Sequence, residues 1–272
     1  RNPVNLHFFN KVIYSLKIFF FLKNEKNEGN ILSRSVLPSI ILSFFGIKNI
    51  LEIHHQLFGI TKVFYKIFKD LNFLKNLRYI LLHKSLVRDF VKKYNKYIIL
   101  DDAVSLTDFK IKKKYKKEKN TCVYVGSFYK GKGFEIIMQL AKGCKNINFH
   151  LYGDKSFIVK KNLKFKNVKI FGHIPYYRVP YILSKYNVAL MPYDKKIYGR
   201  GQIEISNSIS PLKMFDYMAS KKIILATDLK VYRHILQNKY NSILIEPNNI
   251  LEWKRNLEKV FKNLKKYNKL KN

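Results

Sequence analysis

The residues with the clearest chemical potential form a glycine-rich loop, VGSFYKGKGFE, between Val125 and Glu135. From Gly126 to Lys132 the loop matches the pattern G-x-x-x-x-G-K, in which backbone N–H groups surround a phosphate. The next residue is Gly133, whereas a magnesium-dependent triphosphate site needs Ser or Thr there. The loop precedes a predicted helix, whose free N–H groups favour an anion. We therefore expect either an anion site without magnesium or an ordinary glycine-rich turn.

A second stretch, SNSISPLKMFDYMAS at residues 206–220, predicts another helix that begins beside an anion. We expect Ser210 to be its N-cap and Pro211 its first helical residue. Lys213 and Asp216 then lie about one turn apart on this helix. A carboxylate there can accept two hydrogen bonds from a vicinal diol such as that of a ribose, while the lysine and the helix end balance phosphate charge. The alternative is a simple surface pair of a lysine and an aspartate.

Short apolar runs alternate with helix-length segments along most of the chain. The predicted strands are Asn49–Ile53, Tyr79–Leu82, Tyr97–Leu100, Thr121–Val125, Phe149–Tyr152, Val168–Phe171, Val188–Met191, Ile223–Ala226 and Ser242–Ile245. The predicted helices between them include Phe134–Ala141, Pro180–Lys185 and Pro211–Ala219. This alternation is typical of parallel sheets covered by helices on both faces, so it predicts an α/β fold with doubly wound sheets.

One basic segment interrupts this alternation. Lys110–Lys119, KIKKKYKKEK, contains little that a core can bury, so we predict a solvated linker over residues 110–120. The linker separates an N-terminal α/β domain, residues 1–109, from a C-terminal one, residues 121–272. No strand, glycine loop and helix follow one another near the start, and the chain begins with Arg1. We therefore expect the N-terminal domain to be incomplete.

The chain carries a formal net charge of +35, from 53 basic and 18 acidic residues among 272. Such a charge suits nucleic acid or an anionic membrane surface. Lysine, asparagine and isoleucine recur along the whole chain, which indicates a compositional bias behind most of the excess. Arginine, the residue that reads nucleic acid best, is scarce. We expect weak, salt-sensitive association with acidic lipid and no specific nucleic-acid partner.

The region from Val123 to about Phe261 resembles the donor-binding half of retaining glycosyltransferases of family 4. The ordered series is V-G-S, K-G, L-Y-G, F-G-H-I-P, V-A-L-M-P-Y and S-P-L-K-M-F-D-Y-M-A, of which the last is the most specific. The resemblance implies a GT-B fold, with two Rossmann-like domains that face a cleft. In the N-terminal part, NILEIHH at residues 49–55 resembles the acceptor-side strand of the same family.

The resemblance also implies roles for individual residues. Lys132 would contact the nucleotide diphosphate, and Gly126 would allow its close approach. Asp216 stands where the family usually has a Glu that binds the ribose hydroxyls, and His54 aligns with a His near the transferred sugar. Ser127 replaces an Arg that is frequent in the family. The expected donor-binding residues are Gly126, Ser127, Lys132, Gly133, Ser210, Pro211, Leu212, Lys213 and Asp216, with His54 as the catalytic candidate and no metal ligand.

The function implied by the resemblance is transfer of a sugar, with retention, from a UDP- or GDP-linked donor to a cell-envelope polysaccharide or a lipid-linked acceptor. No cofactor or metal is expected, because helix N-termini and lysines would stabilise the departing diphosphate. The expected location is the cytoplasm, at the inner face of the cell membrane. A P-loop-like nucleotide-binding protein and a basic nucleic-acid-binding protein are the alternatives.

Overall fold

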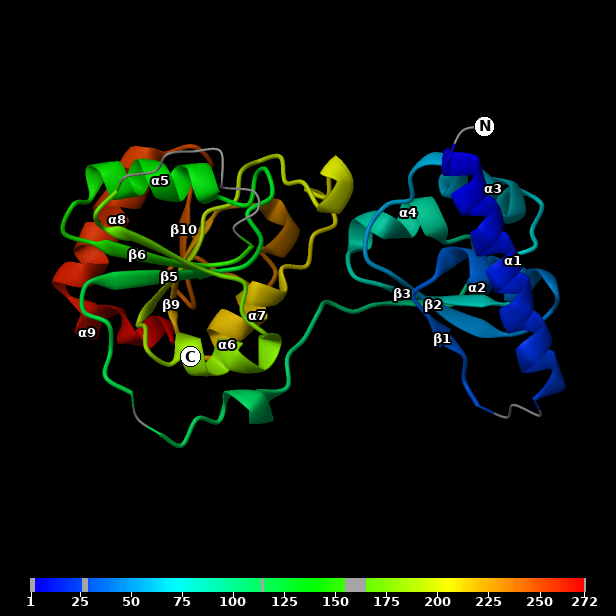
Figure 1. Ribbon diagram of the computed structural model, residues 1–272, viewed down its shortest axis with the longest axis horizontal. Coiled ribbons are helices and arrows are strands. Elements are labelled where there is room, and N and C mark those ends of the chain that lie inside the picture. Colours follow the sequence, from blue (N-terminus) through cyan, green and yellow to red (C-terminus); the bar gives the residue numbers. More distant parts are fainter. Residues whose placement is uncertain (1–2, 26–28, 114, 155–164, 272) are drawn as a thin grey trace. The chain divides into compact units, whose positions relative to one another are not determined.

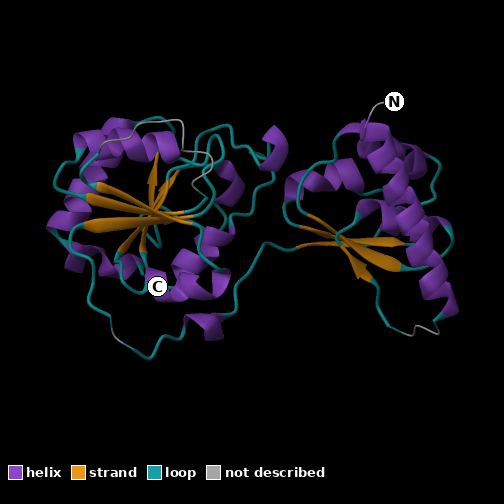
Figure 2. Cartoon of the chain, viewed as in Figure 1, coloured by secondary structure: helices purple, strands orange, loops and turns teal. Residues whose placement is uncertain are grey.

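The computed structural model describes residues 3–25, 29–113, 115–154 and 165–271 (Figures 1 and 2). The chain forms two compact units, each built around one parallel sheet. The N-terminal unit comprises Arg1–Asp101 together with Asn207–Ser210, and the C-terminal unit comprises Asp102–Ser206 and Pro211–Asn272. The predicted α/β class with two parallel sheets is therefore confirmed.

The N-terminal unit has a four-stranded sheet with the order β1-β2-β3-β4. Its strands are β1 (Leu32–Ser33), β2 (Asn49–Ile53), β3 (Leu77–Leu81) and β4 (Tyr97–Ile99), and its helices are α1 (Pro3–Asn24), α2 (Val36–Phe44), α3 (Gly59–Asp70) and α4 (Val87–Phe90). Alternate residues of β2 and β3 are buried against α2 and α3, which explains why both strands were visible in the sequence. The two-residue strand β1 has no such pattern, and the sequence did not predict it.

The apolar run IFFFL at residues 18–22 belongs to α1 and is only partly buried. Phe19 is buried, but Phe20 and Phe21 are exposed. Within the part of the chain that the structure describes, no helix combines the length and hydropathy that a membrane span requires.

The C-terminal unit has a six-stranded sheet with the order β10-β9-β8-β5-β6-β7. Its strands are β5 (Thr121–Val125), β6 (Asn148–Tyr152), β7 (Val168–Gly172), β8 (Val188–Met191), β9 (Ile223–Thr227) and β10 (Ile243–Ile245). Its helices are α5 (Phe134–Gly143), α6 (Val179–Leu183), α7 (Leu212–Ala219), α8 (Ile250–Lys262) and α9 (Leu264–Tyr267). Figure 1 shows α5 and α8 on one face of this sheet and α6 and α7 on the other. Because both faces are covered, the central strands β5, β8 and β9 are buried along their whole length.

The direction of winding changes between β5 and β8. The chain passes from β5 outward to β6 and β7, and then crosses back to begin β8 on the other side of β5. Neighbouring loops diverge at such a switch point, and ligands of doubly wound sheets bind in the crevice that results. The loop after β5 is the glycine-rich loop of residues 126–133.

A tyrosine of α7 holds β5 and β8 together where their pairing ends. The last residue pair of this ladder is Val123 with Ala189. Beyond it, the backbone N–H of Val125 donates to the Tyr217 hydroxyl at 2.9 Å, and that hydroxyl donates to the Leu190 carbonyl at 3.3 Å. The buried side chain of Tyr217 therefore completes the hydrogen bonds that the diverging strands no longer supply.

We predict that Tyr217→Phe destabilises the C-terminal unit by about 1–3 kcal/mol, because it leaves a buried backbone N–H without an acceptor. Urea unfolding monitored by circular dichroism measures the change. Tyr240→Phe, at an exposed tyrosine, is the matched control and should leave the midpoint unchanged. Equal midpoints for Tyr217→Phe and the wild type would contradict the bridging role.

Candidate functional site

The glycine-rich loop is braced against the loop that follows β8. A Cβ atom on Gly131 would lie 1.9 Å from the Lys196 carbonyl oxygen, and one on Gly133 would lie 2.2 Å from that of Pro192. Both glycines also have a positive φ. A residue with a side chain would therefore be strained in its backbone and would clash with these carbonyl oxygens. Both glycines therefore allow a close approach of the chain's own backbone, and Gly133 is also the N-cap of α5. The expected donor-binding role of Gly133 stays a prediction.

Gly126 differs from the other loop glycines because a side chain faces it. A Cβ atom there would lie 2.6 Å from Nζ of Lys213, at a φ of +146°. Lys213 belongs to the first turn of α7, so the loop after β5 and the start of α7 meet at this point. The two stretches in which the sequence predicted anion sites are thus brought together, as a shared site requires.

The ammonium group of Lys213 is buried without a hydrogen-bond partner. The residue is 8% exposed, and its Nζ is the one charged atom among the unpartnered buried side-chain atoms of the described residues. It lies 3.6 Å from the ring centroid of Tyr124 and 5.2 Å from that of Tyr193. Cation–π contacts of this kind compensate in part for lost hydration. They leave the hydrogen-bonding capacity of the ammonium group unused.

Both its burial and a neighbouring cation act on the ionisation of Lys213. Burial lowers the pKa of Lys213 well below its ordinary value, and repulsion by Lys132 lowers it further, against a smaller opposing effect of Asp216. Burial also lowers the pKa of Lys132. An anion placed beside both lysines would favour their charged forms, which burial disfavours.

Tyr124 joins the lysine to the glycine loop. Its hydroxyl lies 2.8 Å from the Ser127 carbonyl and 3.0 Å from the Lys132 carbonyl, so it ties the two ends of the loop to β5. Its ring supplies the face on which Lys213 rests. Sequence reasoning did not select Tyr124, because a tyrosine within a buried strand is indistinguishable from an ordinary core residue.

Asp216 lies one turn beyond Lys213 on α7 and is 5% exposed. Its Oδ1 accepts a hydrogen bond of 2.9 Å from the hydroxyl of Tyr176, a residue of the short 3-10 helix after β7. Burial raises the pKa of Asp216 to about 6, although the Tyr176 hydrogen bond and Lys213 both oppose this. The sequence did not point to Tyr176, which is one of several aromatic residues in an unremarkable loop.

The predicted start of α7 was wrong by one residue. The helix begins at Leu212, and Pro211 is its N-cap with extended backbone and no side-chain cap. The N-cap position is therefore Pro211 and not the predicted Ser210, and Ser210 is grouped with Asn207–Ser210 in the N-terminal unit. The proline side chain offers no acceptor to the first N–H groups of α7, and the positive N-terminal end of the helix favours an anion.

His54 lies in the N-terminal unit, directly after β2. Its Nε2 is 2.6 Å from Oε1 of Glu52, which also accepts a hydrogen bond of 2.8 Å from Arg34. Burial opposes ionisation of Glu52, but the bonds from Arg34 and His54 outweigh it and lower the pKa of Glu52. The carboxylate therefore fixes the orientation of the His54 ring.

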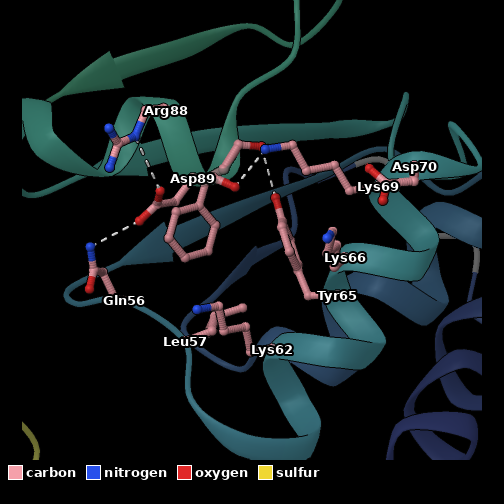
Figure 3. Close-up of a pocket in the computed structure, with 10 residues that line it drawn as sticks. Gln56, Leu57, Lys62, Tyr65, Lys66, Lys69, Asp70, Arg88 and Asp89 are labelled. Carbon is pink, nitrogen blue, oxygen red and sulfur yellow. Dashed lines mark hydrogen bonds and ion pairs between the residues drawn. The ribbon is translucent and has the colours of Figure 1, made fainter.

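The N-terminal unit also contains a basic cavity of about 370 Å³ (Figure 3). One face of α3 lines it with Lys62, Lys66 and Lys69, and Arg88 of α4 also contributes to its lining. Lys69 donates to the Asp89 carbonyl, and Gln56 donates to the Asp89 carboxylate at 3.0 Å. Figure 3 shows these side chains turned toward one hollow between α3 and α4.

Residues 107–272 match the family model described as glycosyl transferases group 1, over more than half of the chain. The chain belongs to the group 1 glycosyl transferases. This membership favours sugar transfer over the P-loop and nucleic-acid hypotheses. None of the curated protein sequences compared with the chain matches it. In the residues that the structure describes, no cluster of three or more His, Cys, Asp or Glu side chains is arranged to hold a metal ion.

Solved structures show the same fold at low sequence identity. A glycosyltransferase from Rickettsia africae superposes with a TM-score of 0.74 at 15% identity, over 96% of this chain and 74% of that one. HepE from Anabaena, solved with UDP, gives 0.67 at 12% identity, over 89% of this chain and 71% of its own. A mutant of S. aureus TarM, solved with Fondaparinux, alpha-GlcNAc-glycerol and UDP, gives 0.62 at 17% identity over 89% of this chain. The chain spans half of that TarM chain. The predicted GT-B fold is thereby confirmed.

We predict that Lys213→Met stabilises the ligand-free protein by about 1–3 kcal/mol at pH 7, because it removes a buried charge that has no partner. The folded-state pKa of Lys213 is lowered, so the unfolded chain binds more protons than the folded one above that pKa. Wild-type stability should therefore rise with pH towards 10.5, and the advantage of the variant should shrink.

Urea unfolding at several pH values between 6 and 9 measures this effect. Lys222→Met is the matched control, because Lys222 is also buried but donates a hydrogen bond of 3.0 Å to the Tyr186 carbonyl. Lys222→Met should therefore stabilise the protein less than Lys213→Met does, or destabilise it, because it removes a hydrogen bond. A Lys213→Met variant that is less stable than the wild type at pH 7 would show that the ammonium group is satisfied.

Proposed function

We propose that the C-terminal unit binds the diphosphate of a sugar nucleotide between the glycine-rich loop and the start of α7. The observation that carries the proposal is the buried, unpartnered ammonium of Lys213 against Gly126. A diphosphate supplies negative charge beside this ammonium, Lys132 and the positive N-terminal end of α7. HepE and TarM, which share the fold, were solved with UDP, which supports a nucleoside diphosphate as the ligand.

The reaction we infer is transfer of the sugar with retention, as in the family 4 enzymes that the chain resembles. The bond between the anomeric carbon of the sugar and the diphosphate oxygen breaks, and the acceptor hydroxyl oxygen forms a new bond to the same carbon. Negative charge develops on the diphosphate beside Lys213 and Lys132. Stabilisation of that charge lowers the barrier because it is greatest in the transition state. The departing diphosphate oxygen takes the proton of the attacking hydroxyl, so no pair of catalytic carboxylates is required. The two lysines and the α7 helix start supply the positive charge without a metal ion.

We assign His54 to the sugar side of the reaction and the basic cavity between α3 and α4 to the acceptor. Its lining has four basic side chains against Asp70 and Asp89, so it suits an acceptor that carries phosphate or acidic sugars. A polysaccharide of the cell envelope or a lipid-linked glycan has this character. The charge of +35 favours association with an anionic membrane surface, where such acceptors are made.

We predict that the protein binds UDP or GDP, and that Lys132→Ala and Asp216→Ala each weaken binding about tenfold or more. Lys213→Met should weaken it further, since it removes the central charge. Isothermal titration calorimetry of the full chain gives the affinities. Lys130→Ala, at an exposed lysine of the same loop, is the matched control and should bind within about twofold of the wild type.

Excess chelator should leave these affinities unchanged, whereas a loss of binding on chelation would revive a magnesium-dependent site. Unchanged affinity in Lys132→Ala, Asp216→Ala and Lys213→Met would place the nucleotide elsewhere. Thermal shift with a panel of UDP- and GDP-sugars then identifies the donor, because the preferred ligand raises the melting temperature most.

A further inference from the structure

Four exposed phenylalanine side chains lie together in the N-terminal unit, near the points where α1, α2 and α3 end. Phe20 belongs to α1, Phe44 is the last residue of α2, Phe45 is its C-cap, and Phe73 lies in the loop after α3. Their exposed fractions are 58%, 44%, 48% and 40%. We call these four residues the aromatic patch. Soluble proteins rarely leave several large apolar side chains together in water unless that surface binds something.

Ring contacts join the aromatic patch into one surface. Phe45 stacks on the buried Phe19 with ring centroids 4.2 Å apart, and Phe19 lies 5.3 Å from Phe20. Phe44 lies 5.1 Å from Phe45 and 4.9 Å from Phe73. Because α1 packs on α2 and α2 on α3 (Figure 1), a continuous row of rings runs from α1 across α2 to the loop after α3.

Hydrogen bonds fix the backbone beneath the aromatic patch. The hydroxyl of Ser43 donates to the Phe73 carbonyl at 2.9 Å, and the side-chain amide of Asn76 donates to the Ser43 carbonyl at 3.2 Å. The backbone N–H of Phe73 donates to the Phe68 carbonyl at 3.0 Å. The end of α2 and the loop after α3 are therefore tied together, and the fold itself holds these rings at the surface.

Basic side chains accompany the aromatic patch. Four exposed lysines lie within three residues of it in the sequence: Lys17, Lys23, Lys48 and Lys75. Lys17 and Lys23 stand three positions before and after Phe20, so they share its side of α1. Two acidic residues, Glu25 and Asp70, lie within five residues of the patch in the sequence. An apolar surface with an excess of positive charge beside it suits a partner that is apolar and anionic at once.

We infer that the aromatic patch docks on a bilayer that contains anionic phospholipid, with its rings between headgroups and acyl chains and the four lysines on the lipid phosphates. Phenylalanine and lysine share these tasks in segments that lie in a membrane interface. A second copy of the chain fits less well, because a symmetric contact would bring the same lysines against one another. The inference rests on the proposed function for its membrane-bound acceptor, but it does not involve the nucleotide site.

The test is flotation of the full chain with vesicles of phosphatidylcholine alone, and with vesicles of phosphatidylcholine and phosphatidylglycerol in equal parts. We expect binding to the anionic vesicles, and we expect Phe20→Ser/Phe45→Ser to weaken it about tenfold or more, since two rings no longer enter the apolar layer. Leu106→Ser/Leu251→Ser is the matched control and should bind as the wild type does. It removes two side chains of 66% and 69% exposure outside the N-terminal unit.

A second pair of variants separates the patch from the net charge of the whole chain. Lys23→Gln/Lys48→Gln should weaken vesicle binding several-fold more than Lys262→Gln/Lys265→Gln does, although both remove two exposed positive charges.

A tryptophan reporter tests insertion without removing a ring from the patch. The chain has one tryptophan, Trp253, which is buried. The emission of Phe20→Trp should shift to shorter wavelength when anionic vesicles are added, because the new indole enters the interface. Tyr240→Trp, at a tyrosine of the C-terminal unit with 67% exposure, should show no such shift.

Three results would overturn the inference. The first is an equal loss of vesicle binding in the patch variants and their controls, which would leave net charge as the only cause. The second is an unshifted emission of Phe20→Trp. The third is a dimer in sedimentation that Phe20→Ser/Phe45→Ser abolishes, without vesicle binding by the wild type, which would make a second copy the occupant. Titration of the same preparations with UDP and GDP keeps the proposed function separate, because nucleotide binding without vesicle binding contradicts this inference alone. Vesicle binding without nucleotide binding contradicts the proposed function alone.

Discussion

The candidate site of the C-terminal unit is built around one buried ammonium group that opposes folding. Lys213 is buried between the ring of Tyr124 and the backbone of Gly126, and no acceptor reaches its ammonium group. Burial of an unpaired charge opposes folding by several kcal/mol in an apolar environment, so the surrounding structure must hold it there. Destabilised groups of this kind are found at functional sites, where the ligand completes what the protein leaves open.

The rest of the unit explains how the charge is held in place. The sheet changes direction between β5 and β8, and Tyr217 bridges these strands where their pairing ends. The loop after β5 is fixed at both ends by Tyr124 and packs its glycines on the loop after β8. In the function that we propose, this braced loop meets the diphosphate with little rearrangement of the positive charges. Electrostatic preorganisation of this kind is the largest contribution to many enzymatic rate enhancements.

Much of this arrangement could be predicted from the sequence, because it follows from local patterns. Continuous apolar runs identified the buried strands, and β2, β5 and β8 have the predicted bounds. The glycine loop and the helix around Lys213 were predicted as two anion sites on one sheet edge, and the structure joins them. The start of α7 was predicted one residue too early. Serine is a common N-cap and proline a common first helical residue, but in the structure Pro211 is the N-cap and the helix begins at Leu212.

What the sequence did not disclose depends on contacts between distant segments. Tyr124 and Tyr176 act through a ring face and a hydroxyl that meet residues about 90 and 40 positions away. The chain has 19 tyrosines, and no local pattern distinguishes these two from the rest. The packing of Gly131 and Gly133 on the loop after β8 was likewise not predicted, because a positive φ suits a close approach by a ligand and by the chain's own backbone alike.

The most direct test of the account is a crystal structure of the protein with the nucleoside diphosphate that it binds. The account predicts a phosphate oxygen within about 2.7–3.1 Å of the Lys213 ammonium, with the diphosphate against Gly126 and the first turn of α7. A nucleotide bound elsewhere, with Lys213 still resting on the Tyr124 ring and without an anion beside it, would contradict the central claim.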